Sequence, residues 1–190
     1  MKALEEKILK EGEVLEGGIL KVGSFLNQLI DTRFTVEMAR HVAQLYDGEK
    51  ITKVLTVEAS GIAIAFAVGA ELGVPVLFAK KHSTSNIHSD VYSAEVYSFT
   101  HQTNYNIVVS KDYINSDDKV LIVDDFLARG NALNGLLQIV DKAGAETVGC
   151  VVAIEKAFQK GGDTLREAGV RVDALACIES MDGEKIVYRR

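Results

Sequence analysis

The chain has 190 residues, of which 47% are hydrophobic and 25% charged, as expected for one ordinary globular domain with a sizeable core. Its net charge of −6 and its lack of a basic cluster argue against a nucleic-acid partner. We expect neither a membrane span nor a signal peptide, and two isolated cysteines, Cys150 and Cys177, suggest buried thiols in a reducing cytoplasm.

The first half of the chain alternates between helical and strand-like apolar patterns. A charged amphipathic helix is expected over residues 3–11, and a second helix over about 32–47. A buried strand over 51–57, an apolar helix over 62–72 and another strand over 74–79 follow. These three should form a βαβ unit with parallel strands and a right-handed crossover.

The second half begins with an antiparallel ribbon and then continues the alternation. Further strands and helices are expected at residues 94–99, 105–109, 120–123, 133–144, 147–154, 163–169, 170–178 and 185–188. Asp163 is a suitable N-cap for the short helix that ends at Gly169. The order of elements predicts an α/β fold, with a mainly parallel central sheet flanked by helices.

An acidic pair, Asp124 and Asp125, follows the most apolar strand of the chain. Gly130 then allows a sharp turn into the next helix, so the pair should face a helix N-terminus at the carboxyl end of a strand. Free amides at a helix N-terminus suit a phosphate, and two carboxylates suit sugar hydroxyls or a metal. A ribose 5-phosphate carries both kinds of group, although an acidic pair alone could equally be a solvated strand end.

The whole stretch resembles the phosphoribosyl-diphosphate signature of the type I phosphoribosyltransferases. The usual loop of that signature is Ala-Thr-Gly-Gly-Thr, and here it is Ala128-Arg129-Gly130-Asn131-Ala132. The resemblance implies that Asp124 and Asp125 are catalytic and that this loop binds the 5-phosphate. Arg129 and Ala132 replace hydroxyl residues, so the side-chain donors are lost unless Arg129 or Asn131 substitutes for them.

A second strand-to-helix turn, Glu58-Ala59-Ser60-Gly61, has the pattern of a phosphate loop. Alone it could be a plain α/β turn. In the family the loop at this place binds the diphosphate, and a basic residue after the next strand, here Lys81, reaches the same group. The polar stretch over 80–90 corresponds to a mobile loop that closes over the reaction.

The base would be recognised by Lys156 and by a segment outside the core. An ammonium has donors only, so Lys156 suits the C6 oxygen of guanine, hypoxanthine or xanthine, although alone it could be a surface lysine. Residues 14–27 form an irregular glycine-rich segment that could simply cap the core. Its sequence is similar to the hood of family members that act on xanthine, which implies that Leu20 and Asn27 contact the base.

The resemblance therefore implies one phosphoribosyltransferase domain over 1–190, with a hood formed mainly by 1–30 and the C-terminal strands. The implied reaction transfers phosphoribosyl from phosphoribosyl diphosphate to N9 of xanthine, with Mg²⁺ bound through the diphosphate and no direct metal ligand. It also implies a homodimer, with the ribbon over 94–109 as a candidate contact. The rival hypotheses are an enzyme for another base, guanine or hypoxanthine especially, and a purine-sensing transcription regulator, which the low pI of about 5.3 disfavours.

Overall fold

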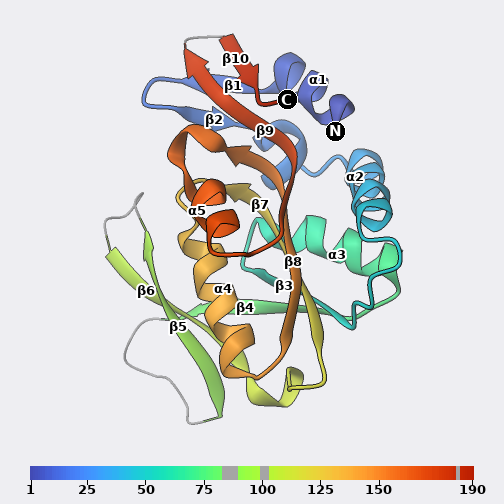
Figure 1. Cartoon of the computed structure of the whole chain (residues 1–190). Coiled ribbons are helices and arrows are strands. Elements are labelled where there is room, and N and C mark those ends of the chain that lie inside the picture. The colour runs from blue at the N-terminus through green and yellow to red at the C-terminus, as the bar shows by residue number, and fades with distance from the viewer. Residues whose placement is uncertain (83–89, 99–102, 183–184) are drawn as a thin grey trace.

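The computed structural model describes residues 1–82, 90–98, 103–182 and 185–190 (Figure 1). The expected mobile loop falls mainly on residues 83–89, which lie outside the described residues. The first half of the chain forms α1 (Lys2–Glu11), β1 (Glu13–Leu15), β2 (Ile19–Lys21), η1 (Gly23–Asn27), α2 (Thr32–Leu45), β3 (Lys53–Val57), α3 (Gly61–Leu72) and β4 (Val76–His82). The second half forms β5 (Val91–Ser98), β6 (Thr103–Ser110), η2 (Lys111–Tyr113), β7 (Lys119–Leu127), α4 (Asn131–Lys142), β8 (Glu146–Lys156), η3 (Ala157–Gln159), α5 (Gly161–Glu167), β9 (Val172–Asp182) and β10 (Lys185–Tyr188).

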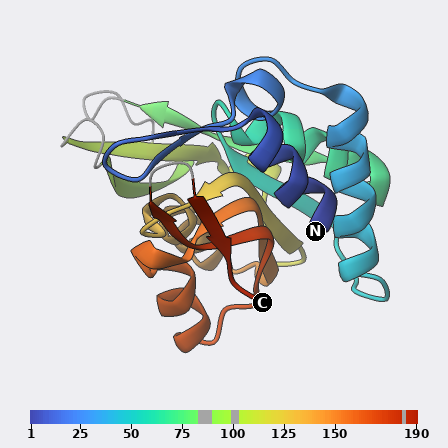
Figure 2. The same cartoon turned by 90° about the horizontal axis from the view of Figure 1, so that it is seen from above.

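One sheet has the strand order β10-β9-β8-β7-β3-β4-β6-β5. Its five central strands, from β9 to β4, are mutually parallel, and the outer strands β10, β6 and β5 pair antiparallel to their neighbours. Helices α1, α2 and α3 cover one face, and α4 and α5 cover the other (Figures 1 and 2). The predicted α/β fold, with its mainly parallel sheet and its antiparallel ribbon, is confirmed.

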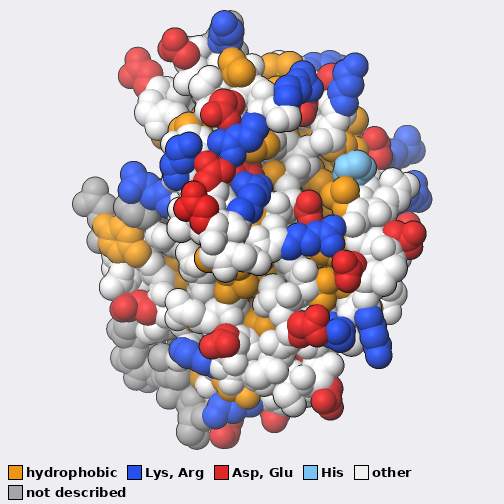
Figure 3. Space-filling model, in the orientation of Figure 1, with side chains coloured by type: hydrophobic (Ala, Val, Ile, Leu, Met, Phe, Trp, Pro, Cys, Tyr) orange, Lys and Arg blue, Asp and Glu red, His pale blue; other side chains and the backbone are white. Residues whose placement is uncertain are grey.

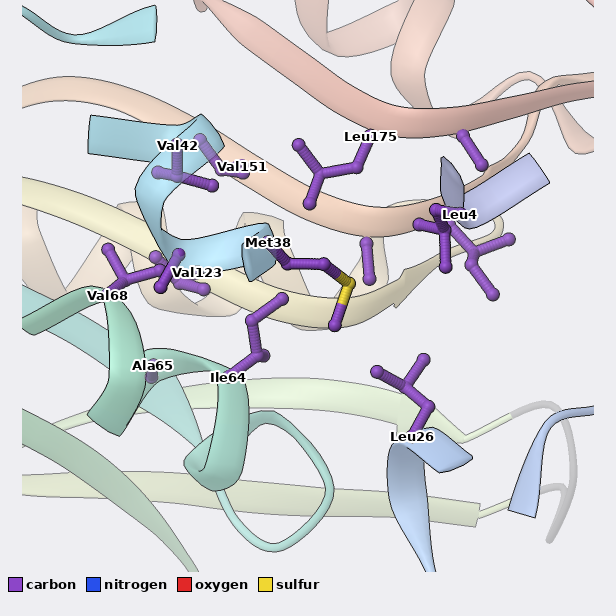
Figure 4. Close-up of a cluster of buried hydrophobic side chains, with 14 of the residues drawn as sticks. Leu4, Leu26, Met38, Val42, Ile64, Ala65, Val68, Val123, Val151 and Leu175 are labelled. Carbon is purple, nitrogen blue, oxygen red and sulfur yellow. The ribbon is translucent and has the colours of Figure 1, made fainter. Parts of the chain in front are cut away.

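Strand β7 separates two hydrophobic cores because successive side chains of a strand point to opposite faces of the sheet. Leu121 and Val123 join the core under α1, α2 and α3, part of which Figure 4 shows around Met38 and Ile64. Val120 and Ile122 join the core under α4 and α5. All four β7 residues are fully buried, which explains their unbroken apolar run.

Strand β7 continues further than the sequence predicted. It runs to Leu127, and its pairing with β8 includes Asp124 opposite Val152, so the acidic pair lies inside the strand and not after its end. Both carboxylate oxygens of Asp125 and Oδ1 of Asp124 accept hydrogen bonds there. The prediction that Asp163 is the N-cap of the short helix α5 is also wrong. Helix α5 already begins at Gly161, and Asp163 lies in its first turn.

The segment expected to be irregular, residues 14–27, contains a hairpin of β1 and β2 followed by one π-helical turn. Gly17 and Gly18 form the hairpin turn with φ of 79° and 73°, a conformation that favours glycine. Each strand has only three residues, so no alternation of any length could reveal them. Lys156 and this hairpin meet in the site described below.

Charged side chains of opposite sign lie next to one another on the face shown in Figure 3. One of the ion pairs of the protein is anchored in its interior. Glu155 is fully buried, and both of its carboxylate oxygens accept hydrogen bonds from the guanidinium of Arg166, at 2.9 and 2.6 Å. No helix within the described ranges is long and apolar enough to span a membrane.

Replacing Arg166 with Ala should destabilise the protein strongly, because it leaves the Glu155 carboxylate buried without a counter-charge. We expect a loss of about 3–5 kcal/mol in the free energy of unfolding, measured by urea denaturation followed by circular dichroism. Arg190→Ala is the matched control, since Arg190 is largely exposed and pairs with Glu5 only at 3.7 Å. That change should cost less than about 0.5 kcal/mol, and equal losses for the two variants would contradict the interpretation.

Candidate active site

A pocket of about 510 Å³ lies at the carboxyl ends of β7 and β8, beside the start of α4. The whole loop Ala128–Ala132 lines it, together with Lys156 and the hairpin turn at Gly17–Ile19. Tyr97 and Tyr105, from the β5–β6 ribbon, form another part of the wall. The carboxyl ends of parallel strands are the usual place for a ligand in such sheets.

The loop into α4 presents backbone donors to this pocket. Gly130 occupies the N-cap position with φ of 85°, and no side chain caps the first amides of the helix. The side chain of Asn131 donates to the carbonyl oxygen of Tyr97 at 2.9 Å, so its amide nitrogen is already engaged by β5. An anion in the pocket would therefore meet backbone N–H groups and the side chain of Arg129, which also lines it.

The acidic pair is held by residues from two distant segments. Asp125 accepts hydrogen bonds from Ser60 Oγ at 3.0 Å and from Asn27 Nδ2 at 3.1 Å, one on each carboxylate oxygen. Asp124 Oδ1 accepts from the backbone N–H of Asp125 at 2.9 Å. Burial raises the pKa of Asp124 well above its ordinary value, and the charge of the neighbouring Asp125 adds to the rise.

The turn Glu58–Gly61 packs directly against this pair. A Cβ on Gly61 would lie 2.6 Å from Asp124 Oδ1 and would also collide with Thr56 Oγ1, so only glycine allows this close approach. The bond between Glu58 and Ala59 is a cis peptide. Glu58 Oε1 accepts from the backbone N–H of Lys81 at 2.5 Å, which joins the turn to the end of β4.

Lys81 and Lys156 bring two cationic groups towards the site. The ammonium of Lys81 lies 5.5 Å from the ring centre of Tyr105, and its charge opposes the rise in the pKa of Asp124. Lys156 Nζ donates to the carbonyl oxygen of Gly18 at 3.0 Å and lies 5.4 Å from the ring centre of Phe126. Burial lowers the pKa of Lys156, as expected for an ammonium that has lost part of its hydration.

The structure brings the expected site residues together in two groups. The loop Ala128–Ala132 and Lys156 line the pocket, whereas the acidic pair contacts the turn at Ser60 and Gly61 and does not itself line the pocket. Leu20 and Asn27 line a second hollow, also of about 510 Å³, bordered by Glu11 and Glu13. Leu20 is mostly buried in the core under α1 and α2. Asn27 contacts Asp125, so the structure places it beside the acidic pair.

Several residues that line the pocket were not among the expected site residues, and Tyr105, Phe126 and Gln159 are examples. Phe126 directly follows the acidic pair, so its position in the motif could have indicated it. Tyr105 reaches the pocket only because the ribbon β5–β6 folds beside α4, and Gln159 only because η3 turns back towards the loop. Nothing local to these two residues signals either contact.

Within the described ranges, no group of three or more His, Cys, Asp or Glu side chains could hold a metal ion. Both carboxylate oxygens of Asp125 already accept hydrogen bonds. Such carboxylates suit a divalent ion that binds mainly to the phosphates of a ligand. They suit less well an ion that is coordinated by protein side chains alone.

Residues 28–180 match the family model described as phosphoribosyl transferase domain. A xanthine phosphoribosyltransferase of Heliobacterium modesticaldum is 53% identical over 99% of this chain and 100% of its own length. One of Brevibacillus brevis is 50% identical over 99% of this chain and 96% of its own. The adenine phosphoribosyltransferase of Rhodothermus marinus, at 20% identity, shares the fold with a TM-score of 0.74 over 94% of this chain and all of its own. This chain belongs to the phosphoribosyltransferase family.

Proposed function

We propose that this protein transfers the 5-phosphoribosyl group from phosphoribosyl diphosphate to N9 of xanthine, giving xanthosine 5′-monophosphate and diphosphate. The observation that carries the proposal is that Lys156 and the loop Ala128–Ala132 line the same pocket. One ligand can therefore meet phosphate-binding amides and a donor for a purine oxygen at once. The choice of xanthine rests on full-length relatives of about half identity that are described as xanthine phosphoribosyltransferases.

The loop Ala128–Ala132 would bind the 5-phosphate. Two features support this role: the uncapped start of α4 offers free N–H groups, and the dipole of a 12-residue helix favours an anion at that end. The usual loop has hydroxyl side chains where this chain has Arg129 and Ala132. Arg129 would bind the phosphate through its positive charge in their place. Asn131 has a supporting role, since its side chain ties the loop to Tyr97 of β5.

The diphosphate would bind at the turn formed by Glu58, Ala59, Ser60 and Gly61, with Lys81 as its cationic partner. The turn lies against the acidic pair, so a ribose held by the pair would have its C1 substituent close to the turn. Mg²⁺ bound to the diphosphate would neutralise the charge of that leaving group. The protein supplies orientation, through the Ser60 contact with Asp125 and the Glu58 contact with the backbone of β4.

Asp124 and Asp125 would accept hydrogen bonds from the ribose hydroxyls and stabilise the transition state. As the bond to diphosphate breaks, positive charge develops on the sugar ring, by analogy with glycoside hydrolysis. Burial makes the charged form of Asp124 costly in the absence of a cation, as the rise in its pKa reflects. A developing cation beside this buried carboxylate therefore gains a strong interaction.

The base would lie against Lys156, with its C6 oxygen accepting from the ammonium. The ring of Phe126 beside this lysine offers an apolar surface to a purine. Adenine would present an amino group to an ammonium, and two donors cannot pair. Leu20 and Asn27 belong to the hood that would enclose the base, Leu20 from within the core and Asn27 beside Asp125. Asn27 donates one amide N–H to Asp125, and its other N–H would serve the C2 oxygen of xanthine. The homodimer and the cytoplasmic location that the resemblance implies stay predictions.

The double variant Asp124→Asn, Asp125→Asn should lose at least about a hundredfold in kcat for xanthine, because it removes the charges that stabilise the transition state. Steady-state rates with phosphoribosyl diphosphate and Mg²⁺ measure this, and circular dichroism checks that the variant is folded. Asp141→Asn is the control, since Asp141 is exposed on α4 and should leave kcat unchanged. A folded double variant with wild-type kcat would remove the proposed role.

Variants of Lys156 and Asn27 test how the base is chosen. Lys156→Ala should lower kcat/KM for xanthine, guanine and hypoxanthine together, since all three offer a C6 oxygen. Asn27→Ala should lower kcat/KM for xanthine more than for hypoxanthine, which lacks the C2 oxygen. A lost partner that leaves a buried polar group unpaired costs about 1–3 kcal/mol, or roughly five- to 150-fold.

Two outcomes would count against this assignment. A wild-type protein that prefers adenine would contradict the role of Lys156. If Asn27→Ala leaves the ratio of kcat/KM for xanthine to kcat/KM for hypoxanthine unchanged, Asn27 only holds Asp125 and does not contact the base.

A further inference from the structure

The chain that leaves Lys156 turns back against the loop Ala128–Ala132. Strand β8 ends at Lys156, the short turn η3 follows, and Lys160 adopts a left-handed conformation with φ of 67°, which is uncommon for a residue with a side chain. The next residue, Gly161, donates its backbone N–H to the carbonyl oxygen of Ala128 at 3.1 Å. The segment after the base-binding lysine therefore contacts the start of the phosphate loop.

This hydrogen bond fixes the orientation of one peptide unit in the loop. The bond between Ala128 and Arg129 is trans, so its C=O and its N–H point in opposite directions. With the oxygen of Ala128 held by Gly161, the N–H of Arg129 is directed away from Gly161. Both Ala128 and Arg129 line the pocket, so the bond favours a loop whose amides are available to an anion.

Gly161 also leaves no room between the two segments. A Cβ on Gly161 would lie 2.5 Å from the carbonyl carbon of Arg129 and 2.6 Å from the nitrogen of Gly130, and it would collide with Ala128 O. All three are backbone atoms, so no side chain could rotate away to relieve the clash. A methyl group here would push the peptide between Arg129 and Gly130 away from Gly161.

The segment is fixed on its other side as well. A Cβ on Gly162 would lie 2.6 Å from the carboxyl carbon of Glu155 and 2.8 Å from Arg166 Nη1. Glu155 directly precedes Lys156, and it is locked by its two hydrogen bonds from Arg166. The pair Gly161–Gly162 is thus packed between the phosphate loop and the end of the strand that carries Lys156.

We propose that Gly161 is a positioning residue for the transfer reaction. Its N–H and its bare Cα hold the loop Ala128–Gly130 with its amides towards the 5-phosphate, and they set the distance between that loop and Lys156. The inference rests on the proposed function, because it assigns the 5-phosphate to this loop. It adds a residue that does not itself line the pocket.

Gly161→Ala tests the proposal through two inhibitors that differ in one group. Ribose 5-phosphate carries the 5-phosphate, whereas inorganic diphosphate does not. The inhibition constant of ribose 5-phosphate and the KM for phosphoribosyl diphosphate should each rise at least about tenfold, as expected when a well-oriented set of amides is displaced. The inhibition constant of diphosphate should change less than about twofold.

Gly169→Ala is the matched control. Gly169 follows the other end of α5 with φ of 86°, so alanine is strained there, yet a Cβ would meet nothing within 4 Å. This variant should lower the melting temperature and leave both inhibition constants at their wild-type values. A loss of ribose 5-phosphate affinity as large in Gly169→Ala as in Gly161→Ala would mean that general destabilisation is the cause, and the proposal would be wrong.

Hydrogen exchange on the wild-type protein decides the matter if Gly161→Ala does not fold. Saturating ribose 5-phosphate should slow amide exchange in a peptide covering residues 157–164, and diphosphate should not. No protection by ribose 5-phosphate would overturn the proposal. A wild type that forms no nucleotide from any purine would refute the proposed function, whereas an active wild type with unchanged constants in Gly161→Ala would refute only the role of Gly161.

Discussion

Burial of β7 on both faces is the constraint on which the site depends. The strand lies between β3 and β8 in the sheet and between two helical layers above and below it. Its residues Val120–Val123 are fully buried, so the strand cannot shift along its axis without exposing apolar side chains to water. The acidic pair and the loop Ala128–Ala132 come next in the chain, so their position is fixed by the strand.

Segments remote in sequence then converge on the end of β7. The turn before α3 reaches Asp125 through Ser60, and the π-helical turn before α2 reaches the same carboxylate through Asn27. The segment after β8 reaches the loop Ala128–Ala132 through Gly161. Each contact is made by a short group, a hydroxyl, an amide or a backbone N–H, so little side-chain entropy is lost in holding the site.

The parts of this site that could be predicted from the sequence are those with long, uniform patterns. The β7 strand, its acidic pair and Gly130 form one continuous motif, and the predicted loop and Lys156 do line one pocket. The hairpin at residues 13–21 could not be predicted, because three-residue strands give too short a pattern. Asp163 suggested a cap, yet the close packing of Gly161 and Gly162 against other segments starts the helix two residues earlier. Such packing depends on tertiary contacts that no local pattern encodes.

The hydrogen bond from Lys156 to Gly18 O bears on the role proposed for this lysine in choosing between purines. Without any purine, the ammonium is already paired with a main-chain carbonyl of the hairpin turn. An ammonium has three N–H donors, so Lys156 can donate to a purine oxygen and keep its bond to Gly18 O. The hairpin turn thus holds the ammonium in place before the base arrives, and a base with a C6 oxygen adds a bond without breaking one. A base that turns an amino group towards this half-buried ammonium meets a donor with its own donor, so the lysine also works against wrong bases.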